Sequence, residues 1–377
     1  MGRFNFTGKV RVNGQDTKYP AYRNGKTKSG DKYSSINFFV NAADNNSANV
    51  EIFGMISDEI RAGKDEDGNE RIIKWEDRKD KSIVDEVDNF RKHVMSLGDN
   101  DDRQSFIAPY DAVEFLNDNI TELKGKRVTV TGRITKNEYN GKISDRFQIQ
   151  NVYLAGEDKK DALTIVEEIF FNKDSIDTSD FKEEKKILVS AYTKEYIDKE
   201  HPAVYVPCTL VIDCSKIDLE NEQHVKIFNA RYAPINLKYE KGKITVNLKG
   251  NKYYSIMAEI RYFNGAEAEE FTEADLTEMQ KMQLEAGIKS LEDFRPSGMA
   301  YGNRTVIYKL VNFDVRGEYS DGCVALDDTV AEFEDNIYVV DTEDSKGKKS
   351  KKKDDGEEID MNEPKEENED FEDDLFG

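Results

Sequence analysis

The stretch KRVTVTGRITKNEYNGKISDRFQIQNVYLA, residues 126–155, carries the clearest structural pattern in this chain. Val128, Val130 and Ile134 alternate with polar residues, as they do in an extended strand with one buried face. The pair Asn140 and Gly141 supplies two residues that tolerate the positive φ angles of a type I′ turn. The stretch therefore predicts a β-hairpin whose apolar face packs on a core.

Further strand patterns lie towards the N-terminus. Residues 3–12, 34–42 and 49–55 are short runs rich in aromatic and β-branched side chains. Residues 24–31, between the first two runs, have the glycine, serine and asparagine content of a loop. Together with the hairpin, these strands predict a mainly β fold with a barrel domain over residues 1–156.

The segment 56–123 interrupts this β pattern and predicts a helical insertion. Ser82 and Asp85 have the spacing of a capping box, which would open a helix whose apolar stripe continues to Val94. Residues 110–123 repeat apolar side chains at helical spacing and lead directly into the hairpin.

The second half of the chain repeats the strand, link, strand pattern. Runs beginning at Lys185, Val204, Lys241 and Thr305 are rich in β-branched and aromatic residues. They predict a second β-rich domain over residues 157–340, and another barrel of the first kind is one arrangement that fits.

The net charge of −22 argues by itself against a nucleic-acid-binding protein, but the charge is unevenly distributed. Residues 354–377 hold 13 acidic residues and one lysine, a net charge of −12, which leaves −10 for the rest of the chain. Residues 1–43 hold eight Lys or Arg against two acids, and residues 124–154 hold seven against two. Basic charge is therefore concentrated in two β-rich segments.

Those two segments also carry interleaved aromatic residues. A protein that binds single-stranded nucleic acid needs cations along the phosphates and aromatic faces on which bases stack. The predicted binding residues are Arg11, Lys18, Tyr19, Tyr22, Arg23, Lys26, Lys28, Lys32 and Tyr33 from the first segment and Arg133, Lys136, Tyr139, Lys142, Arg146 and Phe147 from the second. The structural alternative is that the tyrosines pack against the ends of the fold and the lysines only keep the surface soluble.

No motif for catalysis or for a cofactor is present in the sequence. There are three histidines, no P-loop, no GxSxG and no HExxH, so we expect a protein that is not an enzyme. Cys208, Cys214 and Cys323 form no CxxC pair, which predicts free thiols and no metal site. Neither a signal peptide nor an apolar stretch of membrane-spanning length is evident, and we expect a cytoplasmic protein.

Residues 341–377 have no periodic apolar pattern and are predicted to be a disordered tail, lysine-rich at first and then acidic. The tail ends with apolar residues among carboxylates, which is typical of a short segment that docks on a partner protein. The predicted docking residues are Phe371, Asp373, Asp374, Leu375 and Phe376. A tail that only improves solubility is the alternative. Because the tail presents spaced negative charge, we also expect it to compete with DNA for the basic segments.

The order of strands, basic loop, insertion and hairpin resembles the OB-fold single-stranded DNA-binding proteins of bacteria and their phages. The match rests on Gly125, Val128, Val130, Gly132, Arg133 and Tyr139 in the hairpin and on Phe376 near the tail tip. The resemblance implies an OB-fold barrel that coats single-stranded DNA in replication, recombination or repair. It also implies a tail that recruits replication or recombination proteins, and a phage replication protein in the cytoplasm of the host cell.

The sequence departs from that family in three places. The insertion at 56–123 is longer than the family's connection, the tail tip lacks the family's proline and ends in Gly377, and the second domain has no counterpart in compact bacterial members. The family's homotetramer is therefore not carried over, and a monomer fits equally well. Two other functions stay open: a virion or assembly structural protein, and an RNA-binding OB-fold protein.

Overall fold

The computed structural model describes residues 2–14, 17, 19–43, 46–64, 68–98, 102–139, 142–195, 204–248, 252–263, 281, 284 and 305–313. The acidic tail at 341–377, Lys18, Cys323 and the turn residues Asn140 and Gly141 lie outside this part of the chain.

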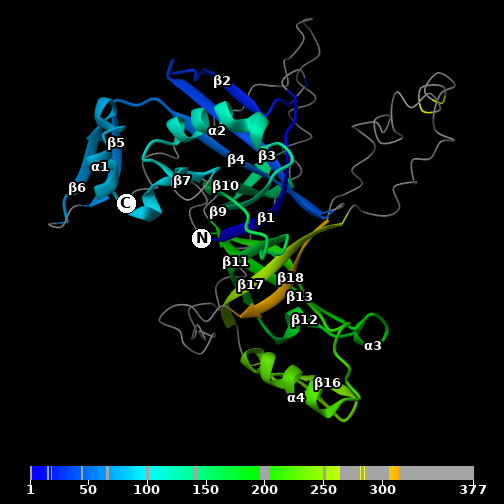
Figure 1. Cartoon of the computed structure of the whole chain (residues 1–377). Helices are drawn as coiled ribbons and strands as arrows, with labels where there is room; N and C mark the ends of the chain where they lie inside the picture. The colour runs from blue at the N-terminus through cyan, green and yellow to red at the C-terminus, as the bar shows by residue number, and fades with distance from the viewer. Residues whose placement is uncertain are drawn as a thin grey trace, which may run out of the picture.

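Five strands in the first half of the chain close into a barrel (Figure 1). They are β1 (Arg3–Arg11), β3 (Lys32–Ala43), β4 (Asn46–Met55), β9 (Arg127–Tyr139) and β10 (Lys142–Leu154). The ring runs antiparallel from β1 to β3 and from β3 to β4, then parallel from β4 to β10, and antiparallel again from β10 to β9 and from β9 to β1. Helix α2 (Pro109–Leu123) comes between β4 and β9 in the chain. This is the five-stranded OB-fold barrel, and the predicted fold class is confirmed.

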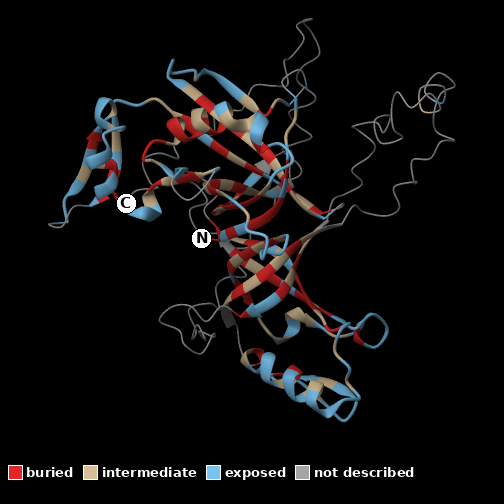
Figure 2. Ribbon diagram, in the orientation of Figure 1, coloured by how far each residue is buried: buried red, intermediate tan, exposed pale blue. Residues whose placement is uncertain are grey.

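Alternation of side chains fills the interior of this barrel. In β3, Ile36, Phe38 and Val40 are buried, and the residues between them face outward and are only half-buried. The predicted face of the hairpin is confirmed, because Val128 and Val130 are fully buried. Figure 2 shows this buried interior in red.

Helix α2 lies close against the barrel because Gly54 of β4 has no side chain. A Cβ atom at Gly54 would lie 2.1 Å from the backbone nitrogen of Tyr110, in the first turn of α2. This close approach allows Ala112, Val113 and Leu116 to be completely buried. The helix predicted over residues 110–123 is therefore confirmed.

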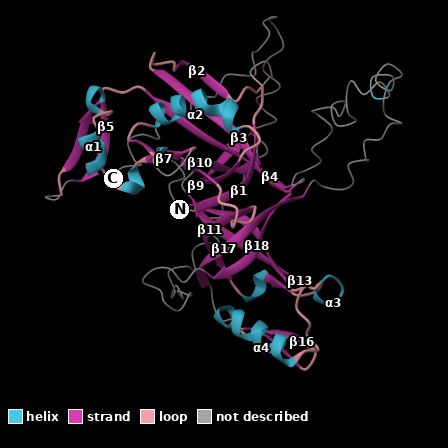
Figure 3. Ribbon diagram, in the orientation of Figure 1, coloured by secondary structure: helices cyan, strands magenta, loops and turns pink. Residues whose placement is uncertain are grey.

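The insertion between β4 and α2 forms a small module beside the barrel (Figure 3). It contains the hairpin β5 (Glu59–Lys64) and β6 (Glu70–Lys74), the 3₁₀-helices η1 (Trp75–Asp77) and η2 (Asn89–Arg91), and helix α1 (Lys81–Glu86). The last two strands of the insertion, β7 (His93–Ser96) and β8 (Gln104–Phe106), extend the barrel sheet instead, because β7 pairs with β10. The module's own core is small and consists of Ala62, Ile73, Val84, Val87 and Ile107.

Trp75 and Arg78 anchor the module to α2. The guanidinium of Arg78 lies 4.0 Å above the Trp75 ring, and its Nε donates to Asp111 of α2 at 2.8 Å. The Trp75 ring also meets Tyr110 of α2 edge to face, with centroids 6.2 Å apart. Trp75 is thus part of a structural contact.

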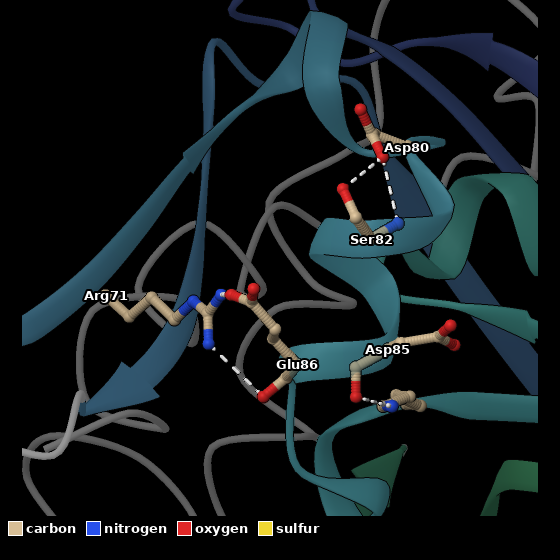
Figure 4. Close-up of polar contacts among 6 residues, drawn as sticks. Arg71, Asp80, Ser82, Asp85 and Glu86 are labelled. Atoms are coloured by element: carbon tan, nitrogen blue, oxygen red, sulfur yellow. Dashed lines mark hydrogen bonds and ion pairs between the residues drawn. The ribbon is translucent and has the colours of Figure 1, made fainter.

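The helix in the insertion begins and ends differently from the sequence prediction. Its N-cap is Asp80, whose carboxylate accepts from the Ser82 backbone N–H at 2.9 Å (Figure 4). The predicted capping box that starts at Ser82 is therefore wrong, because the carboxylate two residues earlier takes the capping position. The helix also stops at Glu86, since Val87 is extended, and Val94 belongs to strand β7.

Five strands of the second half close into another barrel with the same connectivity. They are β11 (Ala162–Phe171), β13 (Lys186–Glu195), β14 (Val204–Asp213), β17 (Lys252–Phe263) and β18 (Thr305–Phe313). The third and fifth of these strands, β14 and β18, are parallel, and every other pair in the ring is antiparallel. The OB-like arrangement considered for the second domain is therefore the one that forms.

The remaining elements of the second half lie around this barrel. They are η4 (Lys173–Ser175), β12 (Ile176–Asp177), α3 (Phe181–Glu184), α4 (Glu222–Arg231), η5 (Ala233–Ile235), and the hairpin β15 (Leu237–Glu240) and β16 (Lys243–Val246). Helix α4 and its hairpin separate β14 from β17, at the position that α2 occupies between β4 and β9.

The two barrels are joined by backbone hydrogen bonding. Strand β1 pairs with β9 on one side and with β11 on the other, with Arg3 opposite Val166 and Thr7 opposite Ala162. The side chain of Asn46 adds a second link, because it donates to the Ile260 carbonyl at 3.2 Å. The division at residues 156 and 157 stays a prediction, and the sheet runs continuously across it.

Candidate nucleic-acid interface

The outer surface of β3 and β4 is the candidate interface. In OB-folds, the second and third strands of the barrel and the loops that flank them bind oligonucleotides. Here those strands are β3 and β4, and the flanking segments are β2 (Tyr22–Lys26) and the tip of the β9–β10 hairpin. The outward-facing residues, which we call the β3–β4 face, are Tyr33, Ser35, Asn37, Phe39, Asn49, Glu51, Phe53 and Met55.

One aromatic pair and one cation–π pair lie on the β3–β4 face. Tyr33 and Phe53 are stacked, with ring centroids 5.4 Å apart and an angle of 27° between the planes. Phe53 is 44% exposed, which is unusual for so large an apolar side chain. Towards the other end of β3, the Arg11 guanidinium lies 4.0 Å above the Phe39 ring. The face therefore presents aromatic surface that bases can stack on, with a cation at one end.

Phe39 and Phe53 were missed by the sequence analysis. They belong to runs whose aromatic content indicates a core, and their neighbours Phe38 and Ile52 are indeed buried. The period-two alternation of a strand is the signal that could have found them, since a residue next to a buried one points the other way.

Exposed cations lie along one border of the face. Arg23, Lys26, Lys28 and Lys32 are exposed, on or beside strand β2 and its turn into β3. Tyr19 is 55% exposed in the segment that leads to β2. These predicted residues are brought together, and they border the stacked pair because Lys32 precedes Tyr33.

Tyr22, a predicted binding residue, contacts helix α2 and the core of the protein. Its hydroxyl donates to Glu114 of α2 at 2.9 Å, and its ring packs against the core. Burial raises the pKa of the Tyr22 phenol, and the neighbouring Glu114 carboxylate adds to that rise. Tyr22 therefore holds β2 against the helix.

An ion pair occupies the middle of the face. Arg146 of β10 donates from Nε to Oε1 of Glu51. Glu51 lies opposite Asn37 on β3 and opposite Gln148 on the parallel strand β10. Burial lowers the pKa of the Arg146 guanidinium, and the side chain remains about one third exposed, at 32%. Arg146 is on the predicted surface, already paired with a carboxylate.

Two predicted binding residues are wrong, because both point into the protein. Phe147 is 3% exposed and packs against Phe6, with centroids 4.8 Å apart, since it faces the same way as its register partner Ile134. Lys136 has a side chain only 4% exposed, and its Nζ lies 2.5 Å from Asp145. A lysine in a polar hairpin was taken for a surface cation, whereas the second barrel covers it.

Of the remaining predicted residues of the second segment, Arg133 is the one whose side chain the structure describes. Arg133 is half-buried on β9, opposite Gln148, one strand beyond Arg146. Its charge adds to the burial that lowers the pKa of His93 to about 4. Tyr139 and Lys142 are paired at the hairpin tip, and their side chains lie outside what the structure describes.

Lys136 belongs to a buried polar cluster at the junction of the barrels. Its Nζ also contacts the Tyr308 hydroxyl at 3.1 Å, and that hydroxyl donates to Asp145 at 2.7 Å. Glu167 and Glu195 of the second barrel approach the same group. Burial raises the pKa of Glu167 to about 8 and raises that of Glu195 as well. The cluster holds more carboxyl groups than cations.

Other chemistry finds little support in the described part of the chain. No group of three or more histidine, cysteine or acidic residues there is arranged to hold a metal ion. Burial raises the pKa of both Cys208 and Cys214 to about 12, and both are free thiols, as predicted. None of the described helices combines the length and apolar character of a membrane span.

Comparisons with known proteins add only a distant likeness. No family model matches the chain, and no curated protein matches it. Two solved structures of the single-stranded DNA-binding protein from Thermus aquaticus align with it. A deletion mutant has 11% identity and a TM-score of 0.30 over 70% of this chain and 87% of the other. The wild-type protein has 8% identity and a TM-score of 0.28 over 70% and 86%. TM-scores this low do not establish a shared function.

Proposed function

We propose that this protein binds single-stranded DNA through the β3–β4 face and coats it without strong sequence preference. The observation that supports the proposal best is the stacked pair Tyr33 and Phe53, exposed on the strands with which OB-folds bind oligonucleotides. The protein needs no cofactor for this function and acts by binding, not by catalysis.

Each part of the face has a role in this proposal. Bases stack on Phe53 and Phe39, and each stacked base contributes about 1–3 kcal/mol. Arg23, Lys26 and Lys32 neutralise phosphates along the border of the face. Stacking is tolerant of sequence because every base has a π face, so such a surface suits a protein that coats DNA.

The cellular role follows from the same proposal. A protein that coats single-stranded DNA serves replication, recombination or repair. The acidic end of the chain, with Phe371, Leu375 and Phe376 among carboxylates, would recruit enzymes of those processes. We place the protein in the cytoplasm, that of the host cell if a phage encodes it.

The decisive experiment is a fluorescence-anisotropy titration of labelled oligo-dT at two salt concentrations, with the full chain and with two variants. Phe53→Ala removes the stacking platform, and we expect a loss of affinity of about 5- to 150-fold. Ile227→Ala is the matched control, because Ile227 is a large apolar side chain, 57% exposed, on helix α4 of the second half of the chain. It should bind as the unmodified protein does.

Two outcomes would contradict the proposal. Absence of salt-sensitive binding by the full chain would favour the structural-protein alternative, because binding to phosphates must weaken as salt rises. Equal affinities of Phe53→Ala and Ile227→Ala would place the DNA elsewhere on the protein. Competition by a matched RNA oligonucleotide separates DNA binding from RNA binding.

A further inference from the structure

Glu51 is an unexpected residue on the β3–β4 face. A surface that binds a polyanion is expected to be basic, and a carboxylate at its centre repels phosphate. Glu51 nevertheless lies between the two exposed rings of the face: Phe53 follows it by two residues on β4, and Asn49, which precedes it by two, is opposite Phe39. Residues two apart on a strand are about 7 Å from each other, so a base stacked on either ring brings its edge near Glu51.

The surroundings of Glu51 are those of a group that accepts hydrogen bonds. Arg146 donates to Oε1 and fixes the position of the carboxylate. Among the described residues, Oε2 has no hydrogen-bond partner, and the side chain is 28% exposed. The residues next to it across the sheet, Asn37 and Gln148, are amides, which also read the edges of bases.

We propose that Glu51 reads the exocyclic amino group of a base stacked on the β3–β4 face and gives the protein a modest preference for cytosine over thymine or uracil. This inference rests on the proposed binding of single-stranded DNA. Glutamate accepts from the N4 amine of cytosine, whereas uracil and thymine present a carbonyl oxygen at the same position and would face Glu51 with like partial charge. Arg146 acts as a positioning residue that fixes the carboxylate.

Oligodeoxycytidine and oligodeoxyuridine of equal length test this preference directly. Cytosine has an amine at C4 and no proton on N3, whereas uracil has a carbonyl at C4 and a proton on N3, and the two bases are otherwise the same. The readout is the ratio of the two affinities by competition anisotropy. We expect the full chain to favour oligodeoxycytidine by about fivefold, which corresponds to about 1 kcal/mol. Glu51→Gln should bring the ratio close to one, because the glutamine amide both donates and accepts.

A matched variant controls for the loss of one negative charge. Glu122 is exposed on α2 and is not one of the residues of the β3–β4 face, so Glu122→Gln changes the net charge equally and should keep the preference. A preference that survives Glu51→Gln, or equal binding of both oligonucleotides by the unmodified chain, would overturn the role of Glu51. Either result would leave the proposed binding of single-stranded DNA in place. Failure to bind either oligonucleotide would overturn the proposed function and the inference with it.

Discussion

The buried carboxyl of Glu167 makes the stability of the protein depend on pH. Its pKa is about 8 in the folded protein, mainly because burial opposes ionisation, and 4.5 is the ordinary value that applies after unfolding. Between these values the unfolded chain has released a proton that the folded chain keeps. Stability is therefore fully present below pH 4.5 and is lost as the pH rises towards 8.

Each pH unit in that interval costs up to about 1.4 kcal/mol, so the whole interval corresponds to roughly 5 kcal/mol. Glu167→Gln replaces the carboxyl with a neutral group of the same shape and should remove this dependence. From pH 5 to pH 9, the free energy of unfolding of the variant should fall by roughly 4 kcal/mol less than that of the unmodified protein. Urea unfolding followed by circular dichroism at pH 5, 7 and 9 measures the difference.

Glu168 provides the control for this experiment. It is the next residue of β11, and its side chain is exposed on the other face of the strand. Glu168→Gln should follow the unmodified protein at every pH. If Glu167→Gln lost stability with pH as steeply as Glu168→Gln does, the carboxyl of Glu167 would not be the group that keeps its proton.

Three further predictions concern packing, the junction and the tail. Gly54→Ala should lower the free energy of unfolding by about 1–3 kcal/mol, because the new Cβ meets the backbone of Tyr110, and thermal unfolding checks this. Lys136→Met should cost about 3–5 kcal/mol in urea unfolding by leaving Asp145 buried without a cation, and adding Asp145→Asn should recover most of the loss. A chain truncated after Val340 should bind oligo-dT more tightly than the full chain at low salt, and the two should become equal at high salt, as anisotropy would show.

The barrel was predictable from sequence because its pattern is local. Val128, Val130 and Ile134 alternate with polar residues, and the strands form as that alternation indicates. The helix boundaries in the insertion were less predictable, because Asp80 and Ser82 are both good N-caps and the sequence does not say which one the chain uses.

The binding face was predictable only in part, because it depends on contacts between distant segments. Lys136 has the sequence context of a surface cation, and its burial depends on Tyr308, which lies 172 residues further along the chain. Phe39 was overlooked because composition indicates that a residue is apolar and not which way it points. The exposed cations of residues 23–32 were placed correctly on the surface, since the segment has no apolar anchor. The loop predicted over residues 24–31 is wrong at its start, because residues 24–26 belong to strand β2, which pairs with β3.

The most direct test of the central claim is photo-crosslinking of the full chain to oligo-dT, with the crosslinked peptides identified by mass spectrometry. We expect crosslinks on β3 and β4, at Tyr33, Phe39 and Phe53. In Phe53→Ala the crosslink at residue 53 should disappear. Crosslinks confined to the second barrel or to the insertion would contradict the claim, because the DNA would then lie away from the β3–β4 face.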